Sequence, residues 1–307
     1  MNKKIRGMVL GCLGCICWGF SGVCINYLTN NYEVGDSWVG CVRLLCAGIV
    51  FLAITLTRER AALVALFHDR RALVLTVAYA ILGMSLMQVV YVIAIRSAGA
   101  ASDSLIAQTS LVYVMLFTCI RKKCTPKKIE LFCIVLAFAG VFCIATKGDV
   151  TKLAIGFLPL MFCLADGVLM FLHNTIPLEP LRKYGTMPVN SVALVLGGIF
   201  LLPVAQPWDV SITFGLDGWL ALGATIFVGA GLGYMLTSQG LKDAGALLGT
   251  FACVLEPVSA MVFSVLILGV TFVFADVLGC LFIAAMMVLL TIGERSPDET
   301  SKAILEP

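Results

Sequence analysis

The sequence predicts an all-α membrane protein with ten transmembrane helices, arranged as two inverted five-helix repeats. Hydrophobic residues make up 60% of the 307 residues and charged residues 13%, against about 45–50% and about 25% in soluble domains. The apolar residues gather in ten long stretches, five in each half of the chain. In addition, the segment AIRSAGA at Ala94–Ala100 returns as GLKDAGA at Gly240–Ala246, an offset of 146 residues.

Each apolar stretch is long enough to cross a bilayer, because a helical span needs about 20 mostly apolar residues at about 1.5 Å per residue. The resulting predicted units are a first repeat at 1–146, a second repeat at 147–293 and a polar cytoplasmic tail at 294–307. We expect the spans at Met8–Leu28, Ser37–Leu56, Ala72–Ile95, Ser102–Ile120, Ile129–Thr146, Leu153–His173, Met187–Val204, Gly218–Gln239, Ala244–Leu268 and Phe272–Ile292.

The distribution of Lys and Arg predicts that both termini are cytoplasmic, since cytoplasmic loops retain these residues. In that orientation only Arg96, Lys147 and Lys152 of the 21 Lys and Arg residues fall on the outer side, and Arg43 lies within a span. Because each repeat has an odd number of spans, the second repeat is inverted relative to the first, as in many secondary transporters. The net charge of +3 follows from this topology and indicates no nucleic-acid partner.

Cysteine and glycine motifs are interpreted as packing positions. The C-x-x-C pair Cys12 and Cys15 lies in a predicted span, where a thiol packs as a small apolar group. We therefore expect no metal site and no cofactor. Small residues permit close helix contact in membranes, and we expect such contact at Gly7, Gly11, Cys15, Gly19, Gly22, Gly229, Gly231 and Gly233.

Several of these features together resemble the drug/metabolite transporter (DMT) superfamily, and in particular its EamA-like family. They are the two five-span repeats, the Trp18-Gly19 pair, Arg43 in the second span, the AGA turns before spans four and nine, and Leu255-Glu256-Pro257-Val258 in the ninth span. The resemblance covers nearly the whole chain. It implies a multi-pass protein of a bacterial-type plasma or inner membrane, with a pathway for a small organic solute between the two repeats.

Charged residues within the spans are the first candidates for the pathway, because a charge in the bilayer usually faces a partner or a wet cavity. Glu256 is expected near mid-membrane, where it could bind an ammonium group, take up a proton or tie helices together. Pro257 is a candidate hinge, since proline removes a helical hydrogen bond. Asp166 could line the pathway or pair with another helix, and His173 is expected at the membrane interface. Arg43 could hold a carboxylate, snorkel or neutralise an acid.

Amide, hydroxyl and aromatic side chains form a second set, able to hold a polar metabolite without committing to its charge. The resemblance places spans three and four, which carry Gln88 and Gln108, at a central cavity. The full set is Trp18, Ser21, Gln88, Tyr91, Gln108, Thr109, Asn190, Tyr234 and Thr237.

We therefore expect a carrier that moves an amino acid or related small metabolite by alternating access, with no enzymatic activity. Export is implied by the resemblance alone. Protons are a candidate coupling ion, and the carrier is expected to be a monomer or a weak homodimer. One alternative is a nucleotide-sugar or cofactor carrier, which would need several basic residues in its cavity. Another is a membrane enzyme acting on lipid-linked substrates, which would need clustered acids, nucleophiles or metal ligands near one interface.

Overall fold

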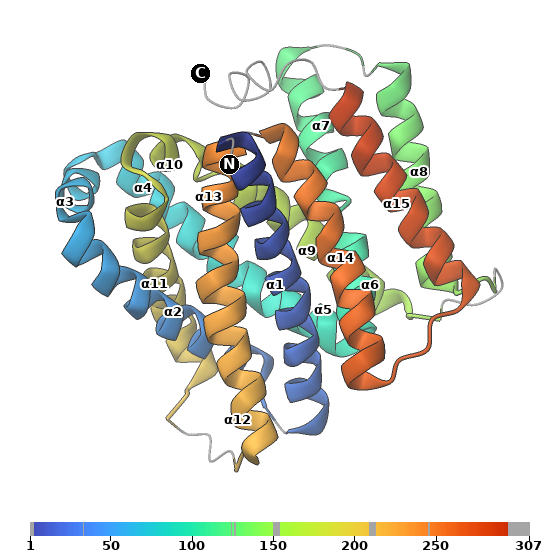
Figure 1. The fold of residues 1–307 in the computed structure, drawn as a ribbon, viewed down its shortest axis with the longest axis horizontal. Coiled ribbons are helices and arrows are strands. Elements are labelled where there is room, and N and C mark those ends of the chain that lie inside the picture. The colour runs from blue at the N-terminus through green and yellow to red at the C-terminus, as the bar shows by residue number, and fades with distance from the viewer. Residues whose placement is uncertain are drawn as a thin grey trace.

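The computed structural model describes residues 3–32, 34–123, 125, 127–149, 154–208, 213–244 and 246–293, and the part of the chain that it describes contains helices and no strands (Figure 1). The predicted tail at 294–307 lies outside these residues. In chain order the elements are α1 (Lys3–Asn31), α2 (Asp36–Arg58), α3 (Arg60–His68), α4 (Arg70–Ala78), η1 (Tyr79–Leu86), α5 (Met87–Ala98), α6 (Ala100–Ala107), α7 (Ser110–Lys122), α8 (Lys128–Thr146), α9 (Phe157–Thr175), α10 (Leu178–Tyr184), α11 (Thr186–Ala205), α12 (Leu216–Gly223), η2 (Ala224–Gly233), α13 (Tyr234–Ala244), α14 (Ala246–Leu268) and α15 (Phe274–Gly293).

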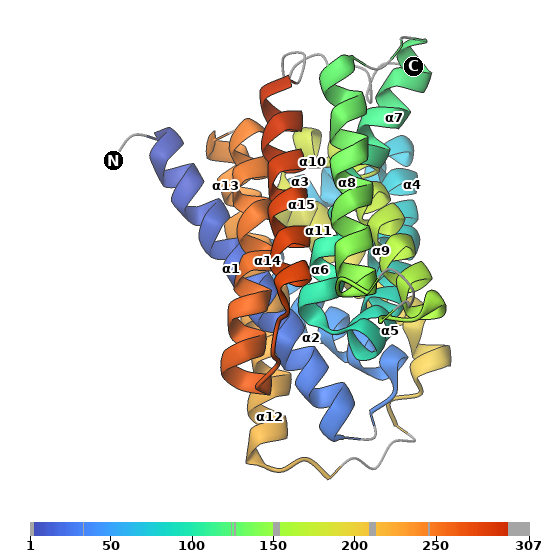
Figure 2. The ribbon, with the colours of Figure 1, turned by 90° about the vertical axis from the view of Figure 1, so that its right-hand side faces the viewer.

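The long apolar helices fall where the sequence predicts spans. Among the described residues, eight helical stretches are long and apolar enough to cross a membrane: Ile5–Asn31, Asp36–Arg58, Arg70–Ala98, Ala100–Phe117, Lys128–Thr146, Phe157–Tyr184, Thr186–Ala205 and Leu216–Thr237. Two shorter apolar stretches, Leu255–Leu268 and Phe274–Leu289, fall within the last two predicted spans. In both views α1 begins and α15 ends at the same end of the bundle, whereas α12 begins at the other end (Figures 1 and 2).

Close contact between α1 and its neighbours organises the centre of the bundle. α1 packs along η2, α13 and α14. A Cβ added to Gly240 on α13 would lie 2.7 Å from the Cα of Gly11 and 2.9 Å from the carbonyl oxygen of Gly7. A Cβ on Gly19 would lie 2.6 Å from the backbone oxygen of Glu256 on α14. The expected small-residue contact along α1 is therefore confirmed at these glycines.

Two of the long helices contain π-helical segments that the sequence analysis did not predict. They are η1, within the stretch Arg70–Ala98, and η2, within the stretch that begins at Leu216. The 146-residue offset places Tyr79–Leu86 opposite Thr225–Leu232, almost the whole of η2. A π segment inserts extra residues into a helical turn and is frequent at functional sites. Both segments therefore disturb the helix at matching positions in the two halves.

The predicted span Ser102–Ile120 coincides with the apolar helical stretch Ala100–Phe117, and within that stretch a turn at Gln108 and Thr109 separates α6 from α7. The amides of these two residues bond three residues back, to Leu105 at 3.3 Å and Ile106 at 3.0 Å, which tightens the chain into a 3₁₀-like turn. By contrast, α14 continues through Pro257.

Two short helices that the sequence analysis missed, α3 and α10, are joined by polar contacts. Asp69 accepts hydrogen bonds from the Arg71 and Ala72 amides at the start of α4, which is an ordinary N-cap. It also accepts from Lys183 Nζ at 2.6 Å and Tyr184 Oη at 2.8 Å. The hydrogen bond from Lys183, followed by that from Tyr184, holds the pKa of the Asp69 carboxyl well below its ordinary value. This group links the α3–α4 connection to α10.

We expect Gly240→Ala to destabilise the protein by about 1–3 kcal/mol, because the new methyl group would overlap backbone atoms of α1, which cannot move aside cheaply. Gly223→Ala is the matched control, since nothing lies within 4 Å of a Cβ at that helical position. Thermal unfolding of both purified variants measures the difference. Equal melting temperatures for the two variants would contradict the close approach of α1 and α13.

Candidate functional site

The sequence-predicted candidates are all placed inside the bundle, and they form two connected groups. Buried side chains are those of Arg43, Gln88, Gln108, Asp166, Asn190, Tyr234, Glu256 and Pro257, whereas Trp18 and Tyr91 are half-buried. One group surrounds Arg43 and includes buried carboxyls. The other is a chain of aromatic rings that passes through Tyr234.

Arg43 on α2 is a buried cation held by neutral groups. Its side chain donates from Nη1 to Gln88 Oε1 at 2.9 Å and from Nη2 to Ser21 Oγ at 3.2 Å. Its Cζ lies 5.9 Å from the centroid of the Tyr91 ring, within the range of a cation–π contact. Nε has no hydrogen-bond partner, and Arg43 forms no ion pair with any carboxylate of the described residues. It therefore keeps both its charge and one donor available for an anion.

The position of Arg43 depends on the η2 segment. A Cβ on Gly229 would collide with Ser21 Oγ and would lie 3.3 Å from Arg43 Nη2. A Cβ on Gly22 would lie 3.0 Å from Tyr91 Oη. Glycine thus allows backbone on two sides to approach the guanidinium and its aromatic neighbour.

Three carboxyls form the acidic part of the same core. Asp166 on α9 and Glu256 on α14 were expected, but Asp103 on α6 was not. Asp103 is 0% exposed, and the Cys163 thiol, a weak donor, lies beside it. Four carboxyl oxygens accept no hydrogen bond from an N–H or O–H group of the described residues. They are both oxygens of Asp103, Oδ1 of Asp166 and Oε2 of Glu256. The three carboxyls interact electrostatically with one another.

Asp103 escaped the sequence analysis because the predicted span begins at Ser102, which places the acid at an interface. The helix in fact begins at Ala100, and a signal for this was present in Gly99, which has φ +88° and ends the preceding helix. With the turn placed at Gly99, Asp103 lies a full helical turn inside α6. An acid in that position is a pathway candidate for the same reason as Glu256.

Two tyrosines connect the cation with the acids. Tyr91 interacts electrostatically with Arg43 and with all three carboxyls. Tyr234 interacts with Arg43, Glu256 and Asp166. Their hydroxyls therefore lie between the two charged parts of the core, and the Tyr91 ring also faces the Arg43 guanidinium.

A row of aromatic rings leads away from Tyr234. Its ring centroid lies 5.4 Å from that of Trp18 and 5.9 Å from that of His173. The His173 centroid is in turn 5.1 Å from that of Tyr79, whose hydroxyl lies 3.5 Å from Asn190 Oδ1. These edge and tilted contacts are favourable ring geometries. Asn190 is thereby placed beside the aromatic row and not in the group around Arg43.

His173, which the sequence analysis expects at the membrane interface, has its side chain buried inside the bundle against η1. His173 Nδ1 lies 2.7 Å from the Gly83 carbonyl oxygen, and Nε2 lies 3.4 Å from Tyr79 Oη. Since a carbonyl oxygen can only accept, Nδ1 carries a proton. A Cβ on Gly83 would lie 3.1 Å from the His173 Cα, so glycine permits this approach.

A cavity of about 420 Å³ reaches this aromatic row from one end of the bundle. Arg6, Arg58 and Glu59 line its outer part, and Asn190 and Tyr234 also line it. The lining residues come from α1, α2, α11 and α13, together with Glu59 just after α2 and Gly185 just before α11. Because Tyr234 also interacts with Arg43, the cavity gives access to the edge of the charged core.

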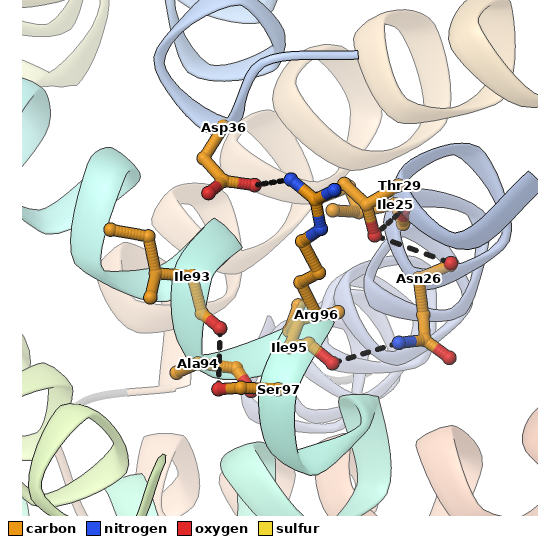
Figure 3. Close-up of polar contacts among 9 residues, drawn as sticks. All are labelled: Ile25, Asn26, Thr29, Asp36, Ile93, Ala94, Ile95, Arg96 and Ser97. Carbon is orange, nitrogen blue, oxygen red and sulfur yellow. Dashed lines mark hydrogen bonds and ion pairs between the residues drawn. The ribbon is translucent and has the colours of Figure 1, made fainter. Parts of the chain in front are cut away.

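The opposite end of the bundle is closed by polar contacts. Arg96 Nη1 lies 3.2 Å from Asp36 Oδ1, and Asn26 Nδ2 donates to the Ile95 carbonyl at 2.8 Å, which ties α5 to α2 and α1 (Figure 3). Asp217 Oδ2 accepts from Tyr27 Oη and Tyr32 Oη, both at 2.6 Å. The described residues place no three His, Cys, Asp or Glu side chains where they could hold a metal ion.

We expect Gln88→Leu to destabilise the protein by about 1–3 kcal/mol, because it leaves a buried Arg43 donor without its acceptor. A double-mutant cycle with Arg43→Met, followed by thermal unfolding, tests this contact. The double variant should lose less stability than the sum of the single variants, since the two side chains share one interaction. Strict additivity would show that Arg43 and Gln88 do not interact.

Comparisons with known proteins agree with this architecture. The family model described as the EamA-like transporter family matches residues 5–146 and again 160–292. An inner membrane transporter of Salmonella typhimurium, YicL, described as uncharacterized, is 24% identical over 96% of this chain and 98% of its own. A transporter of Archaeoglobus fulgidus, also described as uncharacterized, is 28% identical over 41% of this chain and 43% of its own.

A protein of known crystal structure shares the fold. It has a TM-score of 0.66 and 16% identity over 94% of this chain and 97% of that one. The two matches to one family model cover nearly the entire sequence. The same residues form apolar helices of spanning length with charged groups buried among them. The chain is a multi-pass membrane transporter that belongs to the EamA-like transporter family.

Proposed function

We propose that the chain crosses the membrane ten times as two inverted five-helix repeats, 1–146 and 147–293, with both termini cytoplasmic. The paired family matches at 5–146 and 160–292 and the equivalent positions of η1 and η2 support the repeats. That α1 begins and α15 ends at one end of the bundle supports an even number of crossings (Figure 2). The concentration of Lys and Arg on that side supports the orientation.

Labelling from one side of the membrane tests this orientation. A maleimide that cannot cross lipid should modify Lys128→Cys only from the cytoplasm and Arg96→Cys only from outside. Both side chains are exposed at opposite ends of the proposed spans. Both substitutions are made in Cys124→Ser, because Cys124 is the one native cysteine outside the predicted spans, and Cys124→Ser alone is the control. Labelling of the two positions from the reverse sides would refute the orientation.

We infer further that the protein transports a small organic metabolite of the amino-acid type, in the direction of export. The observation that carries this proposal is Arg43, a buried arginine without an ion pair, in a core that also holds three buried carboxyls, none of which forms an ion pair within the described residues. A charge in that position is costly unless a partner or ligand compensates it. A carboxylate of the solute would complete the contact with the free guanidinium donor.

Alternating access is the proposed mechanism. The 420 Å³ cavity lies at the end of the bundle that carries Arg6 and Arg58, which in the proposed topology is the cytoplasmic end. The outer end is tied by Arg96 with Asp36 and by Asp217 with two tyrosines. This arrangement supports an inward-open form, in which a cytoplasmic solute enters past Tyr234. Release would require the outer contacts to separate.

Protons are the proposed coupling ion, and the oligomeric state expected from the sequence, monomer or weak homodimer, is retained as part of the proposal. Buried carboxyls can exchange protons as their surroundings alternate between wet and dry. The rival carrier of nucleotide sugars fits less well, because Arg43 is the one buried Lys or Arg of the described residues. The similarity to transporters likewise disfavours a membrane enzyme.

Counterflow into proteoliposomes tests the function. Vesicles preloaded with a mixture of amino acids should accumulate at least one labelled amino acid in a saturable way. Arg43→Gln should lower the initial rate more than about tenfold while the protein remains monodisperse, because the solute loses its charged anchor. Arg60→Gln is the matched control, since Arg60 is exposed on α3. Unchanged transport in Arg43→Gln would remove Arg43 from the pathway.

A further inference from the structure

The charges of the polar core do not balance. Asp103, Asp166 and Glu256 are 0%, 1% and 6% exposed, and Arg43 is the cation in the same region. Asp276, the remaining buried carboxyl of the described residues, is used elsewhere, where it accepts a hydrogen bond from the Val273 amide at the start of α15. If the three core carboxyls are ionised, the core carries two negative charges more than positive ones.

Unpartnered donors and acceptors coexist in this core. Gln108 Nε2 and Arg43 Nε are buried donors without an acceptor, and four carboxyl oxygens are without a donor. The turn that carries Gln108 packs against α9 next to Asp166, because a Cβ on Gly167 would lie 2.8 Å from Thr109 Oγ1. Buried donors and acceptors that stay unbonded within one core favour a ligand with several polar ends between them. The donor set also disfavours a metal ion, since the described residues bring no three ligating side chains together.

The shape of the neighbouring groups favours an aliphatic ligand. Tyr91 interacts with both Arg43 and the carboxyls, and Trp18 packs edge-on against Tyr234. Such rings pack against methylene groups and also attract cations at their faces. An alkyl chain with positive ends can therefore lie along the tyrosines and extend its charges to the acids.

From these observations we propose that the transported solute is a basic amino acid with two cationic groups. Its carboxylate binds Arg43, and its two cationic groups bind Asp103 and one of the two other carboxyls, Asp166 or Glu256. The third carboxyl keeps a proton, which makes the loaded core neutral. This proposal rests on the proposed function and adds the charge of the solute to it. Asp103, which belongs to the first half of the chain, is thereby assigned a direct contact with the solute.

Binding to the wild-type protein in nanodiscs tests the charge of the solute without any substitution. L-Lysine and L-norleucine differ by the terminal ammonium group but have the same chain length. L-Lysine should bind saturably and at least about tenfold more tightly. Cadaverine, which lacks the carboxylate, should also bind more tightly than norleucine. In Arg43→Gln, lysine should lose affinity while cadaverine keeps it.

One amide variant, with a matched control, tests whether Asp103 takes part in binding. Asp103→Asn should weaken lysine binding at least about tenfold and leave norleucine unchanged. Asp276→Asn is the matched control, because it removes a buried carboxylate outside the core. Equal affinities for lysine and norleucine would overturn the dibasic solute while leaving the transporter proposal intact. The proposal also fails if lysine does not bind, and counterflow with the wider amino-acid mixture then decides separately whether the transporter proposal survives.

Discussion

Contact between backbones along α1 is the constraint on which the rest of the bundle depends. Lipid offers no hydrophobic drive for one apolar helix to prefer another, so membrane helices associate through close packing and polar contacts. In this chain Gly11 meets Gly240, and Gly19 meets the backbone of Glu256. The same stretch of α1 positions Ser21 against Arg43. Packing and the polar core thus depend on a single helix, which contacts different neighbours on different faces.

The polar core shows how the two halves of the chain share one site. Arg43, Gln88 and Asp103 precede residue 146, whereas Asp166 and Glu256 follow it. The arginine of α2 therefore belongs to one half, and the acids of α9 and α14 belong to the other. A solute that contacts Arg43 together with Asp166 or Glu256 bridges the two halves, and their relative movement changes its surroundings. Because the charged groups of the core come from both repeats, binding of the solute depends on how the repeats are arranged.

Sequence reasoning succeeded where one physical quantity decided the outcome. The apolar length of each span predicted α2 and α8 to within two residues of their observed ends, because a bilayer demands that length and little else. It failed where neighbouring helices decided. The burial of His173 depends on the close approach of Gly83, and the interruption at Gln108 depends on local hydrogen bonding. No residue pattern predicts the extra residues that form η1 and η2. Asp103 was missed through an error of two residues in a helix start.

The helical stretch Arg70–Ala98 has 29 residues, which at about 1.5 Å per residue exceeds the roughly 30 Å of the hydrocarbon core. Such an excess is accommodated by tilt, by bending or by local thickening of the lipid. This stretch carries η1, Gln88 and Tyr91. The tilt that a bilayer of given thickness imposes on it therefore acts on the residues that hold Arg43. Transport should therefore depend on the acyl-chain length of the surrounding lipid as well as on the solute.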